Sequence, residues 1–160
     1  MNRVSFFCVL MGLMCGYVQA AELEPVEIEA SIQHSGAKST ITDLIRREQW
    51  ETVTDMIDTG DSAWIALVPK LARGADELAT DELAISLAYA LPKNAPSVLN
   101  ALSLEHVVSI ERVCSMPFAD DIIKDRPAYK RMAMRALDQV KDSDVSRTKL
   151  DCLDFLKRAQ

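Results

Sequence analysis

From Ser39 to the end of the chain, apolar residues recur three and four positions apart, between short helix stop and start signals. In residues 39–60, Trp50, Val53 and Ile57 fall on one helical face, and Gly60 follows where a left-handed residue ends a helix. Strands would show a period of two instead. The pattern therefore predicts an all-α chain of six or seven short helices with no sheet.

Stop and start residues set the expected helix bounds. Asp61 and Ser62 restart a helix after Gly60, Pro92 stops another, and Pro127 opens a later one. Thr80 and Ser103 are expected to begin helices in the same way as Ser62. The expected helices lie at 39–59, 63–73, 81–91, 97–102, 104–114, 128–141 and 145–158. Short turns between them predict antiparallel hairpins, stacked side by side as in an α-solenoid.

The first twenty residues have the layout of a cleavable secretory signal. Arg3 precedes an uncharged apolar run from Val4 to Val18, and small residues then lead to a cleavage position after Ala20. The run is shorter than the roughly 18–20 residues of a membrane span. Lipidation at Cys15 is the rival hypothesis, but the bulky Met14 stands where lipoprotein signals carry a small residue. We expect a periplasmic or secreted mature protein without stable membrane insertion.

The mature chain is expected to contain a leader and one domain. Residues 21–38 show no helical period, and the alternation in "VEIEASI" is typical of a short strand, so they are interpreted as a flexible leader. Residues 39–160 are then a single helical domain. A mature chain of about 140 residues is long enough to bury a core without metals.

Removing residues 1–20 takes away Arg3 and no acid, which leaves 17 basic and 24 acidic residues and a formal net charge of −7. An acidic chain of this kind lacks the basic surface that ordinary nucleic-acid binding needs. The expected partner is another protein.

The signal also removes Cys8 and Cys15, so the mature chain keeps Cys114 and Cys152. An even pair in an oxidising compartment predicts a disulfide. With some 38 residues between them, the loop-entropy model gives roughly 4 kcal/mol of stabilisation.

Enzymatic chemistry has little support in the sequence. A cysteine nucleophile would need a nearby base, and His106 lies eight residues from Cys114, about 12 Å along a continuous helix. His34 and His106 lack partners at metal-ligand spacing, and the three mature glycines form no phosphate-binding loop. We expect no catalytic residues, no cofactor and no metal. An enzyme whose carboxylates converge only in the fold remains an alternative.

Two loops are the expected places for partner contact, at residues 74–80 and 115–125. The second contains Asp120 and Asp121 beside Phe118, which makes these three residues candidate contacts. A basic cluster begins at the end of this loop, and on an acidic protein it is expected to balance neighbouring acids rather than to bind an anion. Its members are Lys124, Arg126, Lys130, Arg131 and Arg135.

The segment "SAWIALVPKLARGADELATDELAISLAYALPKNAPSVLNAL", residues 62–102, resembles a HEAT-type helical hairpin, including Pro69 in its first helix. Such repeats are generally binding surfaces. In size, export signal, helicity and single disulfide the chain is similar to small periplasmic immunity proteins that neutralise toxins delivered by type VI secretion, such as cell-wall amidases. The resemblance implies an inhibitor of a toxin or hydrolase. The alternative is an envelope scaffold with a peptide-binding surface.

Overall fold

The computed structural model describes residues 23–105, 108–115, 125–141, 143 and 145–159. These residues contain ten helices and no strand, which confirms the all-α prediction. The expected signal peptide with Cys8 and Cys15, His106, and the candidate contacts Phe118, Asp120 and Asp121 all lie outside the described residues. The helices are α1 (Pro25–Ser35), α2 (Ala37–Arg46), α3 (Trp50–Asp58), α4 (Ser62–Ile65), α5 (Val68–Ala72), α6 (Glu77–Ala90), α7 (Ala95–Glu105), α8 (Ile110–Cys114), α9 (Arg126–Gln139) and α10 (Ser146–Arg158).

The interpretation of residues 21–38 as a flexible leader is wrong for the part that is described. Pro25 occupies the first turn of α1, where a missing N–H costs little, and Gly36 separates α1 from α2 at a φ of 82°. Ile28 is 2% exposed, and Ile32, one turn later, packs against the same core. The strand-like alternation misled because Val26 faces solvent, whereas the Ile28–Ile32 spacing was the helical signal.

Side chains inside helices explain why two expected starts are wrong. The Thr80 hydroxyl donates to the carbonyl oxygen of Asp76 at 2.7 Å, and the Ser103 hydroxyl donates to that of Asn100 at 2.9 Å. Both hydroxyls therefore bond backward within a helix instead of capping a new one. Asp76 caps α6 by accepting from the Ala79 amide at 2.9 Å.

Two single helices of the prediction are divided in the structure. Pro69 has no N–H for the ladder, and residues 62–72 form the short helices α4 and α5. Residues 37–58 form α2 and α3, separated at Glu48, which has a φ of 58°. These breaks raise the number of helices above the six or seven expected.

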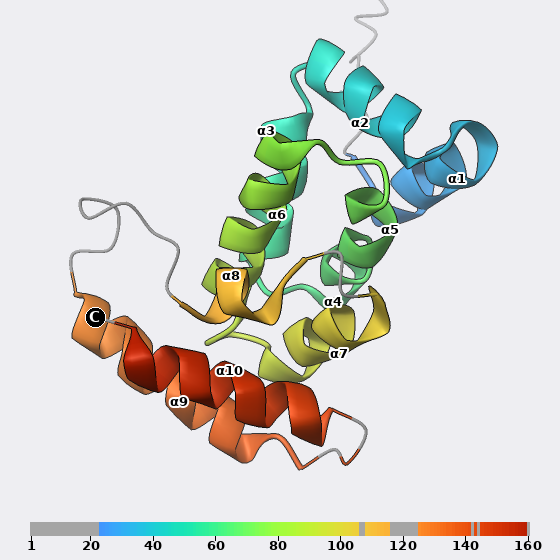
Figure 1. Cartoon of the computed structure of the whole chain (residues 1–160). Coiled ribbons are helices and arrows are strands. Elements are labelled where there is room, and N and C mark those ends of the chain that lie inside the picture. Colours follow the sequence, from blue (N-terminus) through green and yellow to red (C-terminus); the bar gives the residue numbers. More distant parts are fainter. Residues whose placement is uncertain (1–22, 106–107, 116–124, 142, 144, 160) are drawn as a thin grey trace, which may run out of the picture.

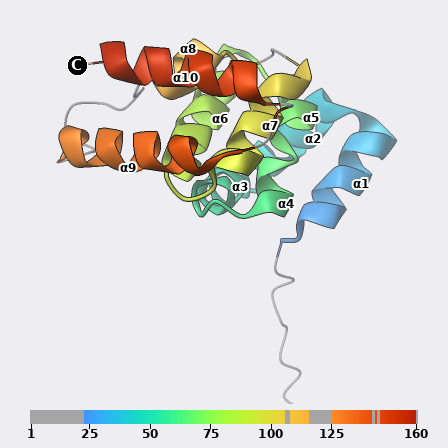
Figure 2. The ribbon, with the colours of Figure 1, turned by 90° about the horizontal axis from the view of Figure 1, so that it is seen from below.

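Helices distant in sequence lie side by side around one core (Figure 1). α3 packs on α6, α8 packs between α6 and α10, and α7 contacts α5, α9 and α10. Figures 1 and 2 agree that α1 lies at one end of the molecule and the α9–α10 pair at the other. We call α1–α8 the body and α9–α10 the hairpin. No helix among the described residues has the length and apolar character that a membrane crossing requires.

The predicted disulfide is present. Cys114 at the end of α8 is bonded to Cys152 in α10, with a Cα–Cα distance of 5.2 Å, and both side chains are fully buried. The Tyr129 hydroxyl of α9 also donates to the carbonyl oxygen of Ala88 in α6 at 2.7 Å. The hairpin is therefore held to the body through both of its helices.

Candidate functional site

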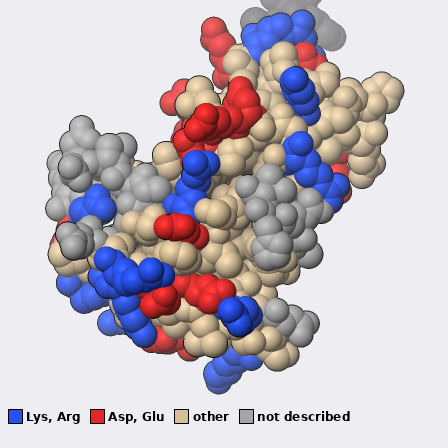
Figure 3. All heavy atoms as spheres, viewed as in Figure 1, with Lys and Arg blue, Asp and Glu red and all other residues tan. Residues whose placement is uncertain are grey.

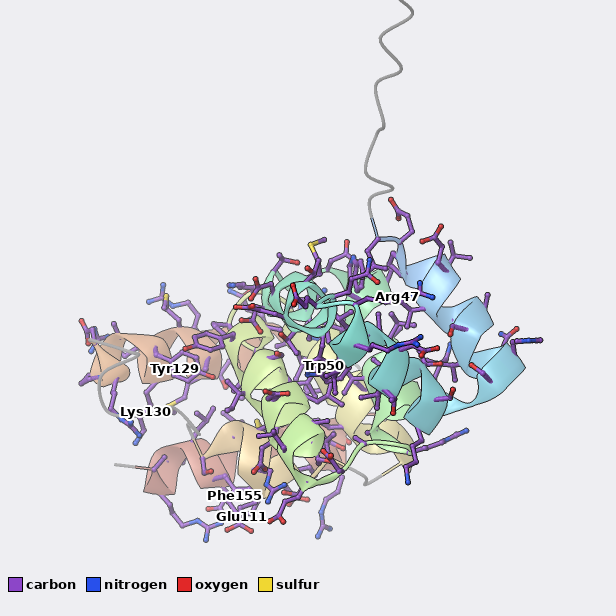
Figure 4. All side chains as sticks on the ribbon, turned by 90° about the horizontal axis from the view of Figure 1, so that it is seen from above. Arg47, Trp50, Glu111, Tyr129, Lys130 and Phe155 are labelled. Atoms are coloured by element: carbon purple, nitrogen blue, oxygen red, sulfur yellow. A yellow bond between two sulfur atoms is a disulfide. The ribbon has the colours of Figure 1, made fainter. Side chains whose placement is uncertain are left out.

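A groove between α3 and α6 gathers polar side chains from two helices that run in the same direction. Trp50, near the start of α3, contacts Glu82, whereas the end of α3 contacts Lys93 just after α6. We define the acidic groove as this cavity of about 360 Å³; its lining residues are Trp50, Glu51, Thr54, Asp58, Glu82, Ile85 and Ser86. Figure 4 shows Trp50 in the interior, between these helices.

Each wall of the acidic groove follows from helical spacing. Trp50, Thr54 and Asp58 are four residues apart and share one side of α3. Glu82 and Ser86 are related in the same way on α6. The Trp50 indole N–H donates to the Glu82 carboxylate, with Nε1 and Oε2 2.6 Å apart. Because indole is a donor only, this bond holds Glu82 at the groove as a hydrogen-bond acceptor.

Asp58 is the half-buried acid at the far end of the groove. Burial raises the pKa of its carboxyl above the ordinary value of 3.8; the Ser86 hydroxyl offsets part of the effect, Asp55 adds to it, and Lys93 opposes it. The Asp58 Oδ1 atom is buried and makes no hydrogen bond to the described residues. Asp58 therefore offers an acceptor that a donor from outside could satisfy.

Asp58→Asn should stabilise the protein near neutral pH. Because the pKa of Asp58 is raised in the folded state, ionising this group favours the unfolded chain, and stability is lost as the pH rises through and above 3.8. The amide has no charge to bury. The melting temperature of Asp58→Asn should exceed that of wild type near pH 7, and the difference should shrink at pH values below 3.8. A difference that grows on acidification would contradict this account of Asp58.

Acidic side chains collect on the outer surface over α3 and α6 (Figure 3). Glu51 and Asp55, one turn apart on α3, are both exposed. Leu78, in the first turn of α6, is 68% exposed and lies one turn before Glu82. The surface thus combines negative charge with an exposed apolar side chain, a composition suited to protein contact.

Neither of the two predicted contact loops is described as a loop over most of its length. Only residues 73–76 separate α5 from α6, so most of the expected 74–80 loop is helical. The other loop is mainly outside the described residues. Sequence reasoning missed Trp50, Asp58 and Glu82 as a group, although each helix carries its own four-residue spacing. Their meeting depends on the packing of α3 on α6 across 32 residues of sequence.

Cys114, Cys152 and the described histidine form no chemical site. Both cysteines are in the disulfide, and His34 is exposed on α1. Within the described part of the chain, no group of three or more His, Cys, Asp or Glu side chains is placed to hold a metal ion. The acidic groove is therefore the candidate functional site, and its chemistry is that of hydrogen-bond acceptors with negative charge.

Known proteins offer no independent guide to this chain. Comparisons with protein-family models, with curated proteins and with solved structures found no match. Function is therefore inferred from the geometry and charge of the acidic groove and its surroundings.

Proposed function

We propose that this protein is exported and works by binding another protein, with the acidic groove receiving a basic side chain of the partner. The observation that carries the proposal is Asp58, whose buried Oδ1 has no hydrogen-bond donor among the described residues, in a groove also lined by Glu51 and Glu82. A lysine or arginine of the partner would supply that donor and a compensating charge. Charge-assisted hydrogen bonds of this kind are about twice as strong as neutral ones.

Charge and exposed apolar surface support the same proposal. A mature net charge of −7 would steer a basic partner toward the protein and raise its association rate. Leu78 could pack against the partner beside the charged contact, since it is exposed next to the acidic groove. A central charged anchor with apolar surroundings is common at tight interfaces.

The class of partner that we propose is a secreted toxin or cell-wall hydrolase, with this protein as its immunity protein or inhibitor. The secretory layout of residues 1–20, the buried disulfide and the small helical body support export and this general character. Binding is proposed rather than catalysis because both mature cysteines are consumed structurally and the groove presents acceptors of one charge.

Reversing the charge at Glu51 and Asp55, which we call the rim of the groove, should weaken binding of the partner. We expect Glu51→Lys/Asp55→Lys to weaken capture by roughly 10- to 100-fold, since each reversal replaces attraction by repulsion at an interface. The measurement is affinity capture from the envelope fraction with the tagged mature protein, followed by mass spectrometry and titration with the purified captured protein.

Glu111→Lys/Asp138→Lys is the control for that experiment, because it makes the same charge change at exposed positions on α8 and α9. Undiminished capture by the control and loss in the rim variant would support the proposal. Equal affinity for all three proteins would reject the acidic groove. Loss in Asp120→Lys/Asp121→Lys alone would transfer the site to the loop that the sequence indicated.

The alternative proposal is an envelope scaffold that binds peptides along a HEAT-like surface. Two open cavities of about 430 and 660 Å³ favour it, because both border Lys70 and Arg73 of the segment that resembles a HEAT hairpin. Weak capture of several envelope proteins, insensitive to Glu51→Lys/Asp55→Lys, would favour the scaffold. A single tight partner in a one-to-one complex would favour the inhibitor.

A further inference from the structure

The hairpin carries charge of the opposite sign to the rest of the mature chain. Residues 126–160 contain nine Lys and Arg against five Asp, a net charge of +4. Residues 21–125 contain eight Lys and Arg against nineteen Asp and Glu, a net charge of −11. The mature protein is therefore strongly dipolar along its sequence, and the hairpin lies at one end of the fold (Figure 2).

The described contacts between hairpin and body do not account for this positive charge. The hairpin is attached by the disulfide, by the Tyr129 hydrogen bond to Ala88, and by apolar residues such as Leu137 and Leu156, both fully buried. The ion pairs shown for the hairpin, Arg147 with Asp151 and Arg158 with Asp154, both lie within α10. Apolar packing and the disulfide therefore hold the hairpin.

The expectation that the basic cluster balances neighbouring acids is not met at three of its positions. Lys130 donates through Nζ to the carbonyl oxygens of Lys157 and Ala159 at the end of α10, at 3.0 and 2.8 Å. That bond is a helix C-terminal cap. Arg131 and Arg135 are exposed on α9 and form no ion pair with any described residue.

Arg131 and Arg135 form an exposed pair of like charges one turn apart. Such a pair weakens an isolated helix slightly. Met132, beside them, is 54% exposed, and Leu150 on the neighbouring helix α10 is 63% exposed. The exposed residues of the hairpin thus include two arginines that pair with no described acid and two apolar side chains, and we call these four residues its outer surface.

We propose that this surface of the hairpin docks on an anionic lipid bilayer, with Arg131 and Arg135 among the phospholipid headgroups. A bilayer suits the arrangement because the two helices lie at one end of the molecule, whereas α3 and α6, which line the acidic groove, belong to the body (Figures 1 and 2). Repulsion from the acidic body is weaker than attraction at the hairpin, because Coulomb energy falls with distance and the arginines are nearer the headgroups. Each arginine near the surface contributes about five-fold to binding.

The bound state leaves the acidic groove available to a protein partner. Docking is electrostatic and peripheral: the apolar side of α9, which includes Ala133 and Leu137, remains in the protein core. Binding should therefore be weak, reversible and sensitive to salt. This inference is independent of the proposed function, because it uses a different surface.

The experiment is co-sedimentation of the mature chain with vesicles of phosphatidylcholine, alone or mixed with phosphatidylglycerol. Arg131→Glu/Arg135→Glu is compared with Lys38→Glu/Arg47→Glu, which makes the same charge change at exposed positions at the end of the body nearer α1. Circular dichroism confirms that each variant is folded. Wild type and control should bind the anionic vesicles at low salt, binding should fall near 0.15 M salt, and the hairpin variant should lose at least about ten-fold.

Three results would overturn the inference. Failure of wild type to bind anionic vesicles at low salt would reject it, as would equal binding to neutral vesicles. Equal losses in both variants would show a response to net charge instead of a hairpin site. Salt-sensitive oligomers without vesicles, abolished by Arg131→Glu/Arg135→Glu in sedimentation velocity, would identify a second copy of the chain as the occupant.

Discussion

Replacing both Cys114 and Cys152 by alanine should lower the free energy of unfolding of the mature protein by about 4 kcal/mol. The bond closes a loop with a sequence separation of 38, and its removal restores the freedom of that loop in the unfolded chain. The loss is a large fraction of the 5–15 kcal/mol typical of a domain. Urea unfolding of both proteins, with and without reductant, measures it.

The control for the disulfide is Leu150→Ala, because Leu150 is exposed on the same helix as Cys152. Leu150→Ala should change the free energy of unfolding by no more than about 0.5 kcal/mol. Titration of denatured, unreduced mature protein should find no free thiol. A stability loss below about 1 kcal/mol for the double alanine variant, or two free thiols, would contradict the role given to the bond.

Gly74→Ala should destabilise the protein by about 3 kcal/mol, at the upper end of the range for overpacking. A Cβ atom at this position would lie 2.2 Å from the backbone nitrogen of Lys38 and 2.8 Å from the Ala37 Cβ. Backbone cannot move aside as a flexible side chain can, so the start of α2 must shift away from α5. Chemical denaturation measures the change in the free energy of unfolding. Amide hydrogen exchange should be faster in α1 and α2 of the variant than in wild type.

Gly36→Ala is the comparison for Gly74→Ala. Its added Cβ would meet nothing within 4 Å, and its cost comes from the positive φ of 82°. With ψ at 157° this backbone conformation is essentially restricted to glycine, so the cost should be about 1–3 kcal/mol. A loss below about 1 kcal/mol for Gly74→Ala would contradict the close approach of Gly74 to the start of α2.

Local signals predicted the C-terminal part of the fold well. The expected segments 128–141 and 145–158 correspond closely to α9 and α10, because apolar residues recur at helical spacing and Pro127 lies in the first turn of α9. Asp125 caps α9 by accepting from the Ala128 amide at 2.7 Å. A proline in the first turn of a helix and a disulfide are readable from sequence because few residues determine them.

Local sequence patterns gave wrong predictions for the N-terminal helix and for two helix starts. Residues 25–35 are helical because Ile28 and Ile32 can pack against α2 and the core, a gain that depends on tertiary contacts. Thr80 and Ser103 had the right chemistry for caps, but their hydroxyls bond to carbonyls one turn earlier. A Ser or Thr hydroxyl can either cap a helix or bond to a carbonyl one turn earlier, and the sequence alone does not distinguish these two roles.

The acidic groove could not be predicted as a site for a related reason. The Trp50–Asp58 and Glu82–Ser86 spacings are visible in the sequence, but they become one cavity only when α3 packs on α6. The crossover through α4 and α5 makes that packing possible by letting two helices run in the same direction. Long-range packing therefore created the site from residues that looked like ordinary solvated helix surface.

Carboxyl footprinting of the complex with the captured partner shows whether the partner binds at the acidic groove. Carbodiimide labelling, quantified by mass spectrometry, would be compared for the mature protein alone and in the complex. We expect Glu51, Asp55 and Glu82 to be protected in the complex. Glu111 and Asp138 should be labelled to the same extent in the complex and in the protein alone. Unchanged labelling of Glu51, Asp55 and Glu82 in a stable complex, with protection elsewhere, would show that the partner does not bind at the acidic groove.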